Sequence, residues 1–262
     1  MAGGGVRTMK FKSAVSAAAI CFALVQAGAS ATTWQAGDLT TYSEANWGGD
    51  PVGSPPSTPP DPGAALLVAQ FDTVYAATFG VTVGSFSGFT MSFDNAQSVL
   101  AYMPSIGPFA ALDGNILNPI STASGGFGGE TLALQFNVDF SDAGKLPGTS
   151  GLRFGDLILA NFTLLPQLNG LTVRQYLADL NILLSGGSSI LTIADLDAAL
   201  PGNFNGAFFD GQPSQFAQDH LIAPASSGET PLPPALALFA TSLGVLGLLL
   251  SKRTRKAATL AG

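Results

Sequence analysis

The chain has 262 residues, which is enough for one domain of ordinary size together with processing segments. All 17 acidic residues lie between Asp38 and Glu229, where only three basic residues occur, so this central part carries a formal charge of −14. Because nucleic acids and anionic lipids are bound by clustered cations, the composition excludes nucleic-acid binding. With 47% hydrophobic and 10% charged residues, the chain has ample material for a buried core.

Residues 1–31 have the pattern of a secretory signal peptide. Lys10 and Lys12 form a positively charged n-region, and a small, apolar run over residues 13–25 follows. This run is long enough for the h-region of a signal but too short to span a bilayer comfortably. No twin-arginine pair precedes it, so we expect export by the general secretion machinery.

Small residues surround the expected cleavage site of this signal. We expect cleavage between Ala31 and Thr32, with Ala27-Gly28-Ala29 as the alternative pattern. The sequence MKFK suggests that translation starts at Met9. The single cysteine, Cys21, lies inside the signal, so the mature chain would contain no thiol and no disulfide.

Residues 32–222 are expected to form the extracytoplasmic globular domain, and strand patterns dominate its sequence. Hydrophobic residues alternate with polar ones over residues 89–93 and again over residues 132–140. Such period-two alternation is typical of a strand that is covered on one side. Weaker strand candidates lie at residues 81–83 and 157–159.

Capping boxes predict helices between these strands. A short helix is expected between Asp94, which is followed three residues later by a glutamine, and Pro104, which would end it. A second helix is expected from Thr172, whose box partner is Gln175, as far as the Gly186-Gly187 pair.

A third helix is predicted from Thr192, where Asp195 completes another capping box, to a stop at Pro201-Gly202. We expect it to form a short helical hairpin with the preceding helix, packed on the sheet. The whole pattern predicts an α+β fold with a mainly antiparallel, sandwich-like β core, plus one C-terminal transmembrane helix.

The C-terminal region is expected to consist of a linker over residues 223–231 and a sorting segment over residues 232–262. Residues 232–250 are 19 uncharged residues, which as a helix would be about 28 Å long, close to the roughly 30 Å hydrocarbon core of a bilayer. A basic cluster follows at once, formed by Lys252, Arg253, Arg255 and Lys256. Because such clusters stay in the cytoplasm, the preceding domain is predicted to lie outside it.

A short Pro-rich motif precedes this apolar segment. It contains Pro231, Leu232 and Pro233. The motif, the apolar segment and the basic cluster resemble, in this order, the PEP-CTERM class of bacterial sorting tails and its VPLPA variant. Thr230 replaces the valine of that variant, and Pro234 is inserted before the alanine. The resemblance implies that an exosortase-type enzyme processes the chain and that it reaches the cell surface or an extracellular polysaccharide matrix.

A second resemblance concerns the domain itself. Residues 124–144 and 168–173 resemble a region that recurs in bacterial secreted and anchored proteins, and this region covers most of residues 65–215. The resemblance implies that this region occurs in other exported proteins. It implies no particular activity.

The sequence offers few residues for catalysis or metal binding. Zinc and copper sites need several histidine or cysteine ligands, whereas the expected mature chain has only His220, which we interpret as a surface residue. Residues 84–88 place phenylalanine where a G-x-S-x-G elbow has its serine. Glycine-rich residues 126–129 precede an expected strand, so a hairpin or bulge turn is favoured over a phosphate-binding loop. Asn161 begins a glycosylation sequon that is incidental on a bacterial chain.

Carboxylates are the one kind of potential catalytic or metal-binding side chain that occurs in number. Asp139, Asp142 and Asp156 could provide oxygen ligands for Ca²⁺, or two of them could serve a glycoside hydrolase. No EF-hand spacing is present, and the favoured interpretation is that they are solvated loop and strand-end aspartates. We therefore predict no catalytic residue, no cofactor-binding residue and no metal ligand.

Three hypotheses about function remain. The first is an exported, surface-anchored or matrix-associated non-catalytic protein of the exosortase pathway, with polysaccharide among the ligands considered. The second is a secreted glycan hydrolase that uses paired carboxylates. The third is an adhesion module that is stabilised by calcium.

Overall fold

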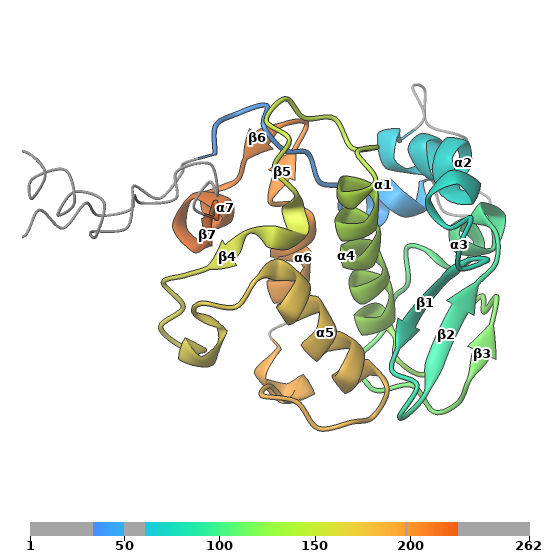
Figure 1. Ribbon diagram of the computed structural model, residues 1–262. Coiled ribbons are helices and arrows are strands. Elements are labelled where there is room, and N and C mark those ends of the chain that lie inside the picture. Colours follow the sequence, from blue (N-terminus) through green and yellow to red (C-terminus); the bar gives the residue numbers. More distant parts are fainter. Residues whose placement is uncertain (1–33, 50–60, 197–198, 225–262) are drawn as a thin grey trace, which may run out of the picture. The chain divides into compact units, whose positions relative to one another are not determined.

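The computed structural model describes residues 34–49, 61–196 and 199–224 (Figure 1). Several predictions concern other parts of the chain, and these lie outside the described residues: the signal peptide, its cleavage site at Ala31 and Thr32, the motif Pro231–Pro233, the apolar segment 232–250 and the basic cluster 252–256. No helix within the described ranges is long and apolar enough to cross a membrane.

The centre of the fold is the helix α4 (Gly126–Asp142), of whose 17 residues twelve are buried. The elements that pack around it are α1 (Glu44–Gly48), α5 (Val173–Leu184), α6 (Ala199–Asn205), the 3-10 turn η1 (Phe154–Asp156) and β1 (Val81–Gly84). Figure 1 shows α4 between α5 and the β1–β2 hairpin. A helix enclosed in this way carries hydrophobic residues on nearly all of its faces.

The prediction of a strand from Leu132 to Phe140 in a sandwich-like β core is wrong, because these residues belong to α4. Since almost every side of the helix is buried, its hydrophobic residues show no helical period. A strand would expose Asn137 together with Gln135 and Asp139, but Asn137 is fully buried. Gln135 and Asp139 are four residues apart and share a partly exposed face of the helix.

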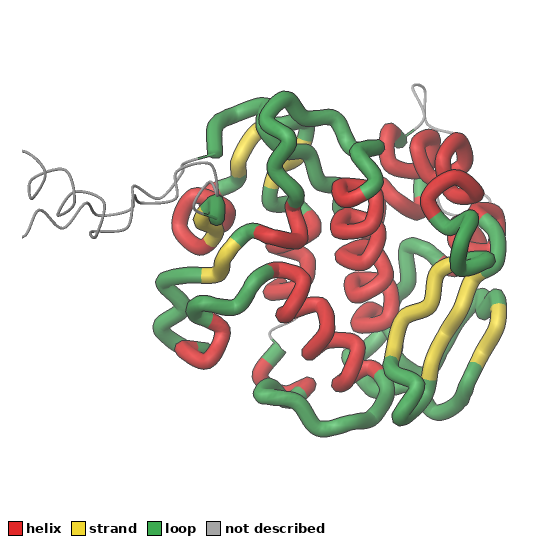
Figure 2. Tube along the Cα trace, in the orientation of Figure 1, coloured by secondary structure: helices red, strands yellow, loops and turns green. Residues whose placement is uncertain are grey.

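The sheets are small, and the architecture is mixed α/β and not a β sandwich (Figure 2). β1 pairs antiparallel with β2 (Thr90–Phe93), with Val81 opposite Phe93. β3 (Ile116–Leu117) extends this sheet in parallel to β2. The predicted strands at residues 81–83 and 89–93 are confirmed as β1 and β2.

Two further pairs of short strands lie on the other side of α4. β4 (Ile158–Leu159) pairs antiparallel with β7 (Leu221–Ile222), and β5 (Phe208–Phe209) pairs antiparallel with β6 (Gln212–Pro213). β4 confirms the strand candidate at residues 157–159. The β4–β7 pair ties the end of the domain to its middle, whereas β5 and β6 form a local hairpin.

The first two predicted helices are confirmed. α3 (Ala96–Tyr102) begins one residue later than predicted, because Asn95 and not Asp94 caps it. α5 begins with the predicted capping box, in which Thr172 and Gln175 bind each other's backbone N–H groups. It ends before Gly186, whose φ of 82° lies in the left-handed region that favours glycine.

The third predicted helix begins as expected and then differs. Thr192 and Asp195 form the predicted capping box, but only the 3-10 turn η3 (Ile193–Asp195) follows. α6 runs through Pro201 and Gly202, so the predicted stop at this pair is wrong. Proline is tolerated in the first turn of a helix because the N–H groups there have no intrahelical partner.

The predicted helical hairpin does not form, although α5 packs against β1 of the small sheet as well as against α4. α5 and α6 meet where the rings of Tyr176 and Phe204 stack with centroids 4.5 Å apart, but both helices cover α4. α2 (Pro62–Val74) and α3 pack against α1, and α7 (Gln215–His220) packs against α6. The short turn η2 (Pro166–Leu168) lies between β4 and α5 along the chain. The helices therefore form most of the layer around the central helix.

The two ends of the described domain are held together. The indole N–H of Trp34 donates a 3.0 Å hydrogen bond to the backbone oxygen of Leu221 in β7. The same indole ring packs edge-on against Phe208, with centroids 5.0 Å apart. β7 lies across α4 from the β1–β2 hairpin (Figure 1).

Candidate functional site

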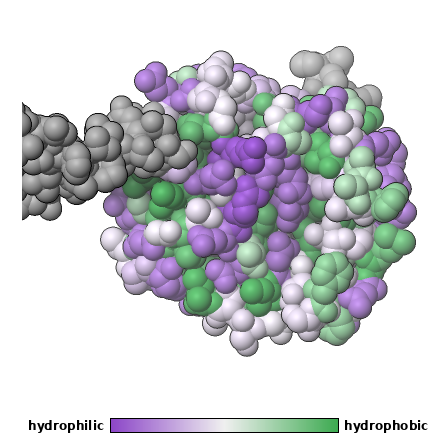
Figure 3. Space-filling view, viewed as in Figure 1, coloured by the Kyte–Doolittle hydropathy of each residue, from purple (hydrophilic) through white to green (hydrophobic). Residues whose placement is uncertain are grey.

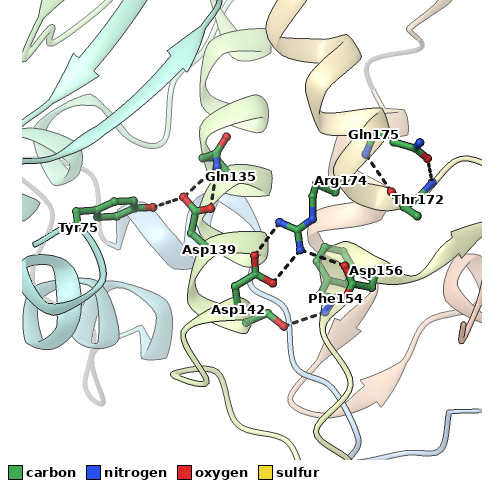
Figure 4. Close-up of polar contacts among 10 residues, drawn as sticks. Tyr75, Gln135, Asp139, Asp142, Phe154, Asp156, Thr172, Arg174 and Gln175 are labelled. Carbon is green, nitrogen blue, oxygen red and sulfur yellow. Dashed lines mark hydrogen bonds and ion pairs between the residues drawn. The ribbon is translucent and has the colours of Figure 1, made fainter. Parts of the chain in front are cut away.

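Three charged side chains meet where α4, α5 and η1 come together, and we call them the Arg174 cluster. Arg174 donates two hydrogen bonds to Asp142, the last residue of α4, at 2.7 and 2.9 Å. It donates a third, of 3.2 Å, to Asp156 (Figure 4). The hydrogen bonds with Asp142 are the main reason that the pKa of Arg174 is raised above its usual value. Arg174 therefore stays protonated and joins the two aspartates through charge-assisted hydrogen bonds.

Asp139 lies one turn before Asp142 on α4, but it has different partners. Its carboxylate accepts 2.9 Å hydrogen bonds from the hydroxyl of Tyr75 and from the side-chain amide of Gln135 (Figure 4). Burial raises the pKa of Asp139, although the hydrogen bonds from these two side chains act in the opposite direction. Burial also raises the pKa of Tyr75, so its phenol remains the donor.

The three aspartates therefore do not form one site. Arg174 binds Asp142 and Asp156, while Asp139 faces Tyr75. In the part of the chain that the structure describes, no group of three or more His, Cys, Asp or Glu side chains could hold a metal ion. Ca²⁺ takes about six to eight oxygen ligands, and a glycosidase needs one of its two carboxyls protonated. The Arg174 cluster supports neither arrangement.

A groove of about 580 Å³ lies beside Asp139, between α4, the segment that follows α2 and the β1–β2 hairpin. We call it the Tyr75 groove, and the side chains that give it its chemistry are Tyr75, Thr78, Thr82, Phe86, Gln135 and Asp139. On the face shown in Figure 3, hydrophilic residues gather over α4 and the start of α5, beside more hydrophobic residues over β1–β3. The groove combines planar polar groups with an aromatic ring.

The glycine-rich residues 126–129 open α4, so the predicted hairpin or bulge turn before a strand is wrong. The first turn of the helix is covered from within the fold. Glu44 accepts hydrogen bonds from the backbone N–H and the hydroxyl of Ser105, at 2.5 and 3.0 Å. A Cβ at Gly129 would overlap both of these residues. Glycine therefore admits the side chain of Glu44 at the N-terminal end of α4, so this end is covered from within the fold.

Glu44 is a buried acid that the sequence analysis did not single out. Burial raises its pKa to about 7, although the hydrogen bond from the backbone of Ser105 opposes this, and the nearby Glu130 raises it further. Burial likewise raises the pKa of Glu130, whose carboxylate accepts a 2.7 Å hydrogen bond from Asn205. The residues that cover these acids come from distant parts of the chain, so no local pattern predicts the burial.

His220, near the end of the described domain, has structural partners. Its ring stacks on Phe162 with centroids 4.4 Å apart and lies 5.1 Å from the ring of Phe216. Its Nδ1 lies 3.0 Å from the backbone oxygen of Ala160 and donates to it. The residue is only partly exposed, and these contacts engage it in packing.

The other residues considered in the sequence analysis also form hydrogen bonds within the fold. The hydroxyls of Ser85 and Ser87 lie 2.9 Å apart in the β1–β2 turn. Asn161, the sequon residue, has a φ of 61° and donates a 2.8 Å hydrogen bond to the backbone oxygen of Asp219. Neither contact resembles an activated nucleophile.

Comparisons with protein-family models, with curated proteins and with solved structures found no match to this chain. The functional argument therefore depends on the residues themselves. Tyr75, Phe86 and Gln135, which line the groove together with Asp139, were not predicted. One signal was available, because residues 135 and 139 are four apart and would share a face if the segment were interpreted as a helix.

Proposed function

We propose that this chain is an exported, surface-anchored or matrix-associated protein whose domain displays a binding surface and catalyses no reaction. The signal pattern of residues 1–31 and the sorting pattern of residues 231–262 support export and anchoring. Its expected partners are the secretion machinery, an exosortase-type processing enzyme and the membrane. No cofactor is proposed.

The observation that carries the non-catalytic part of this proposal is the pairing of Asp142 and Asp156 with Arg174. These are two of the three carboxylates that the sequence analysis considered for a hydrolytic or metal site. An arginine that binds both oxygens of Asp142 engages that carboxyl in two charge-assisted hydrogen bonds. A role in joining α4, η1 and α5 accounts for all three side chains.

The positions of the domain ends support outward display. Trp34 and Leu221 contact each other, so the chain enters and leaves the described domain in the same region. This region lies across α4 from the β1–β2 hairpin that borders the Tyr75 groove (Figure 1). A domain anchored through the residues after 224 would therefore keep the groove accessible.

Removing residues 231–262 tests the anchoring. The full chain is expected in the envelope fraction of its bacterial host, and the shortened chain is expected in the medium, because it lacks the motif, the apolar segment and the basic cluster. A matched control that lacks only residues 257–262 should stay in the envelope. Both proteins are detected with an antibody against the domain. A shortened chain that stays tightly bound to the membrane would contradict the proposal.

A further inference from the structure

We infer that the Tyr75 groove binds one neutral sugar ring of a polysaccharide, with Phe86 stacked on the ring and with Gln135 and Asp139 accepting hydrogen bonds from its hydroxyls. This inference deepens the proposed function, on which it rests, by naming the class of ligand that the displayed domain takes. Three features of the groove carry it: an exposed aromatic ring on an anchored turn, hydrogen-bond acceptors in the lining, and the absence of cationic groups from that lining.

The aromatic ring is Phe86, at the tip of the turn between β1 and β2. It is 95% exposed, which leaves the whole ring in water at the edge of the groove. The C–H faces of a sugar ring are apolar and weakly positive, whereas the face of an aromatic ring is weakly negative, so the two stack favourably. Covering such a ring also removes apolar surface from water.

The turn that carries Phe86 is anchored to α5 and the residue after it. The side-chain oxygen of Asn181 accepts a 2.7 Å hydrogen bond from the N–H of Gly84. On the other side of the turn, the N–H of Phe89 donates a 3.1 Å hydrogen bond to the backbone oxygen of Ser185. An anchored turn loses less backbone conformational freedom when a ligand binds the side chain at its tip.

The floor of the groove presents acceptors and few free donors. The amide nitrogen of Gln135 and the hydroxyl of Tyr75 already donate to Asp139. The amide oxygen of Gln135 has only a long, 3.5 Å contact with the amide nitrogen of Asn181. A carboxylate has about four acceptor positions, and three hydrogen bonds already occupy positions of Asp139, so about one position remains for a ligand. This arrangement suits a ligand that is rich in hydroxyl donors.

The charge and the volume of the Tyr75 groove restrict the class of ligand further. No Lys, Arg or His side chain lines the groove, Asp139 lies in it, and the whole central part of the chain is acidic. Anionic sugars and phosphorylated ligands are therefore disfavoured. The volume of about 580 Å³ lies within the roughly 300–1,000 Å³ that is usual for sites that bind small molecules. A neutral sugar ring of a larger chain fits these limits.

Affinity electrophoresis of the purified full chain in detergent tests the inference. Gels that contain dextran, mannan or galactan supply neutral sugar rings, and a gel that contains alginate supplies anionic ones. We expect at least one neutral polysaccharide to slow the chain and alginate to leave it unaffected. If no neutral polysaccharide slows it, or if alginate slows it more, the inference is wrong.

Substitutions test whether the polysaccharide binds in the Tyr75 groove. Phe86→Ala and Gln135→Ala should each weaken binding about tenfold or more, because stacking or an acceptor is lost. Phe209→Ala, at a half-exposed phenylalanine in β5, is the matched control and should bind like the natural chain. Circular dichroism checks that each variant is folded. Unchanged binding by folded Phe86→Ala would overturn the inference, whereas a failure of envelope localisation would instead contradict the proposed function.

Discussion

Asn137 joins three separate parts of the chain inside the core. Its side-chain oxygen accepts hydrogen bonds from the backbone N–H of Tyr42 and the indole N–H of Trp47, at 2.8 and 3.3 Å. Its side-chain nitrogen donates to the backbone oxygen of Tyr42 and to the side-chain oxygen of Asn205, at 2.8 and 3.0 Å. The amide thus uses all four of its hydrogen-bonding positions, and α4 is fixed to both ends of the domain.

Replacing this residue tests how much the buried network contributes to stability. Asn137→Ala should lower the free energy of unfolding by about 3 kcal/mol, because several buried polar groups lose their partner at once. Urea unfolding of the full chain measures the difference. Asn203→Ala, at an exposed position of α6, is the matched control and should change stability by less than about 0.5 kcal/mol. Equal effects of the two substitutions would mean that the network is not important for stability.

Asn137 also shows why the sequence pattern predicted a strand, and not a helix, for residues 132–140. Between hydrophobic neighbours at positions 136 and 138, a polar residue suggests the solvent side of a strand. Burial of an asparagine is instead favourable when partners satisfy it, and those partners, Tyr42, Trp47 and Asn205, are far away in the sequence. A local pattern contains no information about them.

Among the secondary-structure elements, α4 depends most clearly on close approach of its neighbours. The carboxylate of Glu44 and the hydroxyl of Ser105 occupy the space in which a side chain at position 129 would lie. Glycine is a poor helix former, by about 1 kcal/mol relative to alanine. Its presence in the first turn of a central helix is therefore explained by contact and not by helix propensity.

Gly129→Ala should consequently destabilise the fold although it improves helix propensity. Overpacking of a core costs about 1–3 kcal/mol, and here it would also displace the buried Glu44, so we expect a net loss of about 2 kcal/mol. Gly114→Ala is the matched control, because a Cβ there has no heavy atom within 4 Å and should be tolerated. Thermal unfolding compares the two. A Gly129→Ala variant that melts above the natural chain would contradict the packing explanation.

The elements that were predicted correctly share a local cause. The capping box of Thr172 and Gln175 and that of Thr192 and Asp195 are formed by side chains three residues apart, and both are present. β1 and β2 are joined by a short turn, and their alternation has one buried face. α4 was missed because a helix that is buried on almost all sides loses its period.

At the scale of the whole molecule, buried carboxyls couple stability to pH. Burial raises the pKa of Glu44 to about 7 from the ordinary 4.5, and it raises the pKa values of Glu130 and Asp139 in the same direction. Each of these groups binds its proton more tightly in the folded state than in the unfolded state. Their contribution to stability is complete below the ordinary pKa values, which are 4.5 for the two glutamates and 3.8 for Asp139, and it is lost as the pH rises through the folded-state pKa.

The folded domain should therefore be more stable at pH 5 than at pH 8. For Glu44 alone, the difference between 4.5 and about 7 corresponds to about 3 kcal/mol. Urea unfolding at the two pH values measures the change, and Glu44→Gln separates this residue from the general repulsion of an acidic chain. The variant should show a clearly smaller pH dependence. If its dependence equals that of the natural chain, Glu44 is not the group responsible.

The sequence by itself determined what depends on neighbouring residues and on composition: the acidic centre, the capping boxes and the β1–β2 pair. It is also the basis of the predicted signal and sorting segments at the two ends. Only the tertiary structure decided that residues 132–140 are helical, that Arg174 binds Asp142 and Asp156, and that a groove forms beside Asp139. The physical reason is the range of the interactions. Capping and alternation act within a few residues, whereas burial on all sides, ion pairing and a groove require segments that are distant in the chain to come together.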